Sequence, residues 1–173
     1  MNFWITTDTH LGHTMLTDRN LRPLGFEDKI LKGLKGVLRE GDVLIHLGDV
    51  SFGNDAEWNE KLKDLPCKKW LLRGNHDKHG LSWYISHGWD FVADTISFYH
   101  FGHQILISHV PQPGDYFDIN IHGHFHNTDH RKHEPKISAI LTDKHYLLAL
   151  EFNNYQPWNL KNVIDDFRKR NKK

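Results

Sequence analysis

The sequence predicts an α/β fold that begins with parallel strands. Strand-like and helix-like segments alternate from the N-terminus to about residue 87. Alternation of this kind is typical of parallel strands joined by helical crossovers. The segment at residues 42–47 is almost entirely apolar, as expected for a strand buried on both faces of a parallel sheet.

The first half of the chain supplies three strands and three helices. Strands are predicted at residues 2–6, 42–47 and 69–72. Helices are predicted at residues 26–39, 54–65 and 81–87, after a loop at residues 14–25. Asn54 is expected to cap the second helix, with Glu57 as its capping-box partner.

The second half has a different pattern, dominated by short strands. One hairpin is predicted from residues 95–101 and 104–108, and a further strand from residues 118–121. A second hairpin is predicted from residues 137–141 and 145–152. Asn159 is placed to cap a final helix that ends near Arg170. These later hairpins fit a mixed arrangement of parallel and antiparallel strands.

Composition restricts the class of protein. The 173 residues suit one domain, residues 1–173, with a hydrophobic core. Lys and Arg total 22, and Asp and Glu also total 22. The chain therefore has no net positive charge that would attract nucleic acid or an anionic membrane. The lone Cys67 suits a reducing compartment. No leader or segment of transmembrane length is evident, which predicts a cytoplasmic protein without a membrane partner.

Polar side chains follow the ends of the predicted strands. These residues are Asp8, His10, Asp49, Asn75, His76, His109, His124 and His126. Ligands of open α/β sheets bind beyond the carboxyl ends of the strands. A metal ion takes four to six ligands, and carboxylate, amide and imidazole groups all serve. Eight such groups are enough for a site with two cations.

The order of these motifs is specific. Asp-x-His, Gly-Asp, Gly-Asn-His-Asp, His and Gly-His-x-His follow one another from Asp8 to His126. This order resembles the calcineurin-like metallophosphoesterase superfamily, and residues 147–164 also resemble its small, single-domain bacterial and phage members. The resemblance implies a four-layer α/β/β/α sandwich in which two mixed sheets lie face to face.

The same resemblance implies a two-metal site and a mechanism. Asp8, His10, Asp49 and His126 would hold one metal. Asn75, His109 and His124 would hold the second, with Asp49 bridging through its two oxygens. A hydroxide between the metals would attack phosphorus, and His76 would protonate the leaving oxygen. Manganese is the leading candidate, and Fe, Zn, Ni and Co also accept mixed N/O ligands.

Other residues near these motifs have weaker assignments. His13 and Arg22 are candidates for contacting the substrate phosphate, and Arg73 and Arg131 are further candidates to line the cleft. Asp77 is expected to be structural, either capping the next helix or orienting His76. Asn75 has an alternative role as a turn former. His46 and His122 are expected to be core histidines with satisfied hydrogen bonds.

One departure from the superfamily limits the substrate. Its protein Ser/Thr phosphatases carry Gly-Asp-x-x-Asp-Arg-Gly, whereas this chain has Gly-Asp-Val-Ser-Phe-Gly at residues 48–53. We therefore expect a phosphohydrolase that acts on phosphodiesters or small phosphoesters. A nuclease-like member acting on DNA or RNA is an alternative, although the neutral charge counts against it. A non-catalytic protein-binding scaffold is another, although this sequence keeps every metal ligand and the acid.

Overall fold

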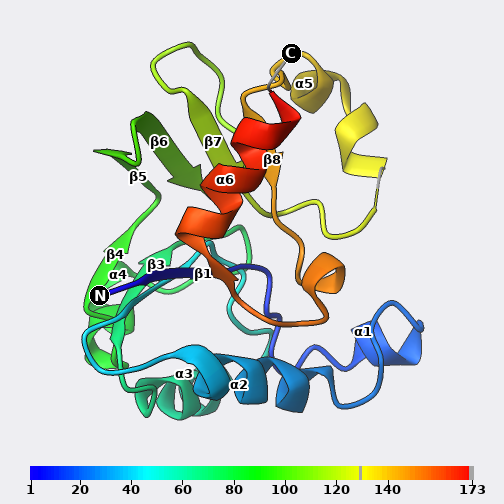
Figure 1. The fold of residues 1–173 in the computed structure, drawn as a ribbon. Helices are drawn as coiled ribbons and strands as arrows, with labels where there is room; N and C mark the ends of the chain where they lie inside the picture. Colours follow the sequence, from blue (N-terminus) through cyan, green and yellow to red (C-terminus); the bar gives the residue numbers. More distant parts are fainter. Residues whose placement is uncertain (129, 172–173) are drawn as a thin grey trace.

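The structure, a computed structural model, describes residues 1–128 and 130–171 and contains two mixed sheets (Figure 1). The first sheet has the strand order β4 (Phe91–Ala93), β3 (Lys68–Leu72), β2 (Val43–His46), β1 (Phe3–Thr6) and β9 (Trp158–Asn159). The second has the order β5 (Thr95–His100), β6 (His103–Ser108), β7 (Ile119–His122) and β8 (His145–Leu147). The predicted α/β class with two mixed sheets is confirmed.

Helices and two apolar clusters complete the fold. The helical segments are α1 (Met15–Asp18), α2 (Phe26–Val37), α3 (Asp55–Lys63), α4 (Leu81–Ser86), η1 (His130–His133), α5 (Pro135–Ser138), η2 (Leu150–Asn153) and α6 (Leu160–Arg170). One cluster joins α2 and α3 to the first sheet, through Ile30, Leu34 and Leu44 among others. The other joins both sheets to α6, where Ile164 and Ile107 are fully buried. Figure 1 shows α2 and α3 on the opposite side of the first sheet from the second sheet.

Parallel pairing places the carboxyl ends of neighbouring strands at the same edge of each sheet. Strands β1, β2, β3 and β4 are parallel neighbours, and β6, β7 and β8 are too. Hydrogen bonds between the loops that follow these strands link the two sheets. His109 Nδ1 lies 2.8 Å from the Leu47 carbonyl oxygen, and the His124 N–H donates to Asp8 Oδ2 at 3.0 Å. The two sheets therefore share one functional edge.

The predicted second hairpin is wrong. Residues 135–138 form helix α5, with Pro135 in the first turn, where its fixed φ and missing N–H are tolerated. Strand β8 pairs in parallel with β7, and the chain then turns into η2. The apolar residues of this segment had the spacing of strands, but local i to i+4 bonds such as Leu141 N–H to the Ile137 carbonyl at 3.2 Å replace strand pairing.

Element ends differ from the prediction at several further points. Asn54 precedes α3 but has φ +52° and makes no capping bond with its side chain, so the capping box does not form. The cap at Asn159 is confirmed, because its Oδ1 accepts the Lys161 N–H at 3.0 Å. Short elements α1, β4 and β9 were not predicted. Among the described residues, no helix is both long and apolar enough to cross a bilayer.

Candidate metal centre

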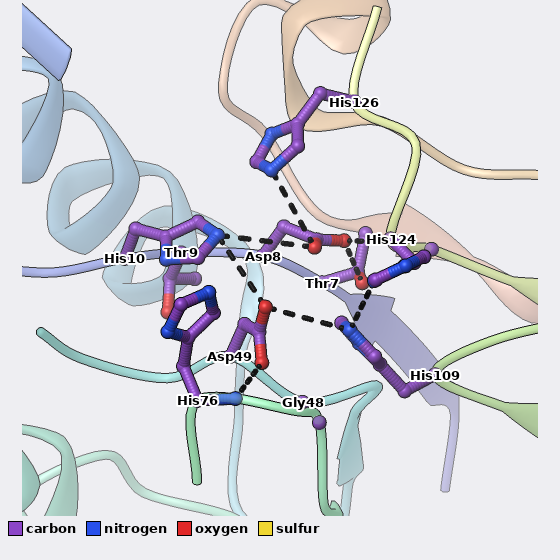
Figure 2. A network of polar contacts seen from close by, with 12 residues as sticks. Thr7, Asp8, Thr9, His10, Gly48, Asp49, His76, His109, His124 and His126 are labelled. Atoms are coloured by element: carbon purple, nitrogen blue, oxygen red, sulfur yellow. Dashed lines mark hydrogen bonds and ion pairs between the residues drawn. The ribbon is translucent and has the colours of Figure 1, made fainter. Parts of the chain in front are cut away.

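The turns after five strands carry the predicted ligands, and the structure brings all of them together. Two ligands follow β1, one follows β2, one follows β3, one follows β6 and two follow β7; they are Asp8, His10, Asp49, Asn75, His109, His124 and His126. Figure 2 shows most of these side chains pointing toward a common centre. They separate into two groups that meet at Asp49.

The first ligand group consists of Asp8, His10 and His126. Asp8 Oδ1 lies 4.0 Å from His10 Nε2 and 3.8 Å from His126 Nε2. This oxygen is buried and has no hydrogen-bond partner, whereas Asp8 Oδ2 accepts bonds from the Thr7 hydroxyl and the His124 N–H. Buried polar atoms are rarely left unpaired, so an unpartnered carboxylate oxygen facing two imidazoles fits a cation site.

The second ligand group combines Asn75, His109 and His124. His109 Nε2 lies 3.0 Å from both Asn75 Oδ1 and His124 Nδ1. His109 is buried and its ring is oriented by the contact of Nδ1 with the Leu47 carbonyl. A backbone carbonyl that accepts from Nδ1–H leaves Nε2 with its lone pair, as a metal ligand requires.

Asp49 connects the two groups. Its Oδ2 lies 3.6 Å from His10 Nε2 and 3.4 Å from His109 Nε2. Its Oδ1 accepts the backbone N–H of His76 at 2.8 Å. The family resemblance implies that Asp49 bridges two metals. In the structure its Oδ2 faces both ligand groups, and its Oδ1 holds the loop of His76.

The charges at this centre favour a cation. Burial alone would raise the pKa of Asp49, but hydrogen bonding and charge interaction with His109 hold it well below its usual range. Burial likewise lowers the pKa of His109, yet Asp49 and Asp8 raise it to about 9. The field that favours a proton on His109 also favours a metal ion in front of it. The nitrogen and oxygen donors therefore fit divalent metals.

The backbone of the centre is strained. Five of the ligands have positive φ, between +45° and +73°: Asp8, His10, Asp49, His124 and His126. Non-glycine residues rarely adopt this region, and such residues cluster at functional sites where the surroundings hold them. Adjacent glycines allow the close packing, because a Cβ on Gly74 would collide with Asp49 and a Cβ on Gly123 with Thr7 and Asp8.

Comparison with known proteins identifies the family. The sequence profile described as calcineurin-like phosphoesterase matches residues 1–171. The chain belongs to the calcineurin-like phosphoesterase family. The family assignment agrees with the motifs at the strand ends and with the candidate metal-binding groups.

Proteins similar to this member of the family occur in a mycobacterial phage and in Aquifex aeolicus. The Gene 66 protein of Mycobacterium phage L5 is 30% identical over 161 residues, which cover 73% of this chain and 78% of the phage protein. The crystal structure of AQ665, a protein of unknown function from Aquifex aeolicus, matches with a TM-score of 0.75 and 28% identity, over 95% of this chain and 98% of AQ665. The architecture described above is therefore shared with a solved bacterial protein over almost its whole length.

Two candidate residues of this family member line the rim of the centre. His76 is half-buried, and its ring lies 5.4 Å from that of His10 (Figure 2). His13 stacks on Phe52, with their ring centroids 4.0 Å apart. The ring centroids of Phe52 and His76 are 5.3 Å apart, in an edge-to-face arrangement. Burial lowers the pKa of His13, and nearby His76 lowers it further. Phe52, 43% exposed, was not predicted as part of the site.

Asp77 supports the loops of the centre. Its carboxylate accepts the backbone N–H groups of Asp49, Gly74 and Val50 at 2.7, 2.7 and 3.1 Å. It thereby joins the loop after β2 to the loop after β3. The structural role expected from the sequence is correct, but Asp77 fulfils it by bracing these loops and does not cap α4, whose N-cap is Gly80.

Arg22, expected from the sequence to contact the substrate phosphate, is buried beside the first ligand group. Its side chain is only 1% exposed, and its guanidinium contacts Glu151, two backbone carbonyls and the His126 ring. In this arrangement all three guanidinium nitrogens donate to protein groups. Arg73 lines an open groove beside Asn75 and His109, where it binds Asp94, and the Arg131 side chain lies outside what the structure describes.

The core histidines are confirmed, and one acidic residue of the site was missed. His46 and His122 are buried and hydrogen-bonded, to Thr9 and Gly48 and to the Gly123 carbonyl respectively. Glu151, which contacts both Arg22 and His126, had no sequence signal because it lies in a segment predicted as a strand.

Proposed function

We propose that the chain is a metal-dependent phosphohydrolase with a two-metal site. The observation that carries the proposal is the position of Asp49, whose Oδ2 faces His10 of one ligand group and His109 of the other. Divalent metals bound there would polarise a phosphoryl oxygen and lower the pKa of a water molecule. Manganese is the first candidate, with Fe, Zn, Ni or Co as alternatives.

The residues have separate tasks in this proposal. Asp8, His10, Asp49 and His126 hold one metal, and Asn75, His109 and His124 hold the other together with Asp49. The His76 imidazole, at the rim and outside both ligand groups, donates a proton to the leaving oxygen. His13, which faces His10 at a ring separation of 5.6 Å, contacts the phosphate.

The proposed substrates are phosphodiesters or small nucleotide-like phosphoesters. The loop at residues 48–53 has no Asp-Arg pair to clamp a phosphoprotein, and it instead places the exposed ring of Phe52 at the rim. The free thiol of Cys67 supports work in a reducing compartment such as the cytoplasm. We treat residues 1–173 as one domain in this proposal.

Hydrolysis of bis(4-nitrophenyl) phosphate tests the function. Metal-free protein is assayed before and after addition of Mn²⁺, together with Asp49→Ala and the control Asp115→Ala, which removes a side chain that is 98% exposed. We expect turnover that requires Mn²⁺, is abolished in Asp49→Ala and is retained in Asp115→Ala. No turnover by the Mn²⁺-loaded wild type, or equal turnover by Asp49→Ala, would contradict the proposal.

A further inference from the structure

We propose that Arg22 and Glu151 form a positioning pair that holds the first ligand group and sets its metal affinity independently of the second. The inference rests on the proposed two-metal site. The side chains of Arg22 and Glu151 are 1% and 8% exposed, and Glu151 is a member of neither candidate ligand group. Their effect must pass through the ligands that they contact.

Arg22 contacts the backbone between the first two metal ligands, Asp8 and His10. Its Nη2 donates to the Asp8 carbonyl at 2.8 Å, and its Nη1 donates to the Thr9 carbonyl at 2.9 Å. These carbonyls belong to the segment in which Asp8 and His10 both have positive φ. Since that conformation is unfavourable for residues with a side chain, bonds from a buried guanidinium help to hold it.

Glu151 fixes the guanidinium and approaches the third ligand. Glu151 Oε1 accepts from Arg22 Nε at 2.9 Å and from Nη2 at 2.8 Å. The same oxygen lies 3.4 Å from His126 Nδ1, and Arg22 Nη2 lies 3.3 Å from that nitrogen. His126 Nε2 is on the Asp8 side of the ring (Figure 2). A carboxylate behind a ligating imidazole orients the ring and strengthens it as a donor.

The second ligand group is supported by different contacts. His109 Nδ1 lies against the Leu47 carbonyl, and Asp49 Oδ1 accepts the His76 N–H. None of the hydrogen bonds described for Arg22 or Glu151 reaches His109 or Asn75. Loss of the pair should therefore weaken one metal site selectively. Loss of general folding would weaken both.

Metal titration tests this selectivity. Metal-free wild type, Glu151→Gln and Arg22→Lys are titrated with Mn²⁺ by calorimetry, after circular dichroism has shown that each is folded. We expect one of two Mn²⁺ sites to weaken by about 10- to 100-fold, as is typical when a partner behind a metal ligand is lost. The other site should keep its affinity to within about twofold. Arg22→Lys keeps the buried positive charge and decides the outcome if Glu151→Gln does not fold.

Reference variants identify which site has weakened. His126→Ala marks the first group and Asn75→Ala the second. The effect of Glu151→Gln should add to that of Asn75→Ala but not to that of His126→Ala, because contacting residues are coupled and independent ones are additive. The matched control is Asp94→Asn, because Asp94 accepts from Arg73 Nε and Nη2 at 3.0 and 2.7 Å, but its side chain is 72% exposed.

The possible results separate this inference from the proposed function. Wild-type affinity at both sites of Glu151→Gln, or equal weakening of both sites in a folded variant, would overturn the positioning pair. A wild type that binds no Mn²⁺ would instead contradict the metal centre itself. Selective weakening that is shared with His126→Ala and absent from Asp94→Asn would support the pair.

Discussion

At the scale of single residues, Asn75 and His76 are neighbours in the sequence that have different surroundings. The Asn75 amide oxygen lies 3.0 Å from His109 Nε2, within the second ligand group. The His76 side chain lies outside both groups, against the rings of His10 and Phe52, while its backbone N–H holds Asp49. Two adjacent side chains can thus serve binding and proton transfer separately.

Substitution of each residue should separate these tasks. We expect His76→Ala to keep both metals but to lose about 10²- to 10⁴-fold in kcat, the usual contribution of a general acid. The loss should be smaller for a 4-nitrophenyl ester than for an alkyl ester, because nitrophenolate leaves without a proton. Asn75→Ala should weaken one Mn²⁺ site. Calorimetry measures Mn²⁺ binding by the two variants, and kcat is measured with both esters. Equal metal loss in both variants would contradict the acid role of His76.

At the scale of elements, the end of β2 is joined to the loop after β1 by a chain of hydrogen bonds. The Gly48 N–H donates to His46 Nδ1 at 3.0 Å, so that nitrogen carries no proton. His46 Nε2 lies 2.9 Å from the Thr9 hydroxyl, which donates to the Val50 carbonyl at 2.6 Å. The network requires a neutral imidazole, because a proton on Nδ1 would remove the acceptor of the Gly48 N–H.

Stability should therefore fall in acid. Burial lowers the pKa of His46 to about 3, and Asp49 only partly opposes this. In the unfolded chain, His46 binds a proton as the pH falls below its ordinary pKa of about 6.5. In the native state, it binds that proton only near pH 3. Below pH 6.5, His46 should reduce the free energy of unfolding by up to about 1.4 kcal/mol per pH unit.

Urea unfolding from pH 4 to pH 6.5 with EDTA present measures this slope without metal binding. We expect His46→Gln to have a lower free energy of unfolding. Its free energy of unfolding should also depend less steeply on pH, by up to the equivalent of one bound proton. His133→Gln, at an exposed position, is the control for removing a histidine elsewhere. An unchanged slope in His46→Gln would show that the buried imidazole is not the group that titrates.

At the scale of the whole molecule, the centre joins the two sheets. Asp8, His10, Asp49 and Asn75 follow strands of the first sheet, whereas His109, His124 and His126 follow strands of the second. Asp49 and His109 approach each other across this boundary at 3.4 Å. A metal ion bound by both sheets would bind the native arrangement but not an unfolded chain.

Metal binding should consequently raise the melting temperature. A ligand at 100 times its Kd stabilises the native state by about 2.7 kcal/mol, which corresponds to a shift of roughly 5–10 °C for a chain of this length. Scanning calorimetry with EDTA, and then with excess Mn²⁺, measures the shift. Asp49→Ala should respond much less than the wild type, and equal melting temperatures of the wild type with and without Mn²⁺ would contradict the prediction.

Local sequence patterns were sufficient to predict the early strands, the helices between them and the set of polar residues after the strand ends. These features depend on local apolar spacing and on glycine-containing turns, and both can be recognised within a short stretch of sequence. The capping box at Asn54 and the second hairpin were wrong for the same reason, because local patterns there compete with backbone conformations and pairings that the rest of the fold selects.

The arrangement of those residues around the centre depends on contacts that form only in the folded chain. The tertiary structure placed Asp49 Oδ2 between His10 and His109 and assigned Asp49 Oδ1 to the His76 loop. It also buried Arg22 against Glu151, 129 residues further along the chain. The physical reason is that carboxylate orientation and burial depend on neighbours from both sheets, and no local pattern in the sequence records such distant contacts.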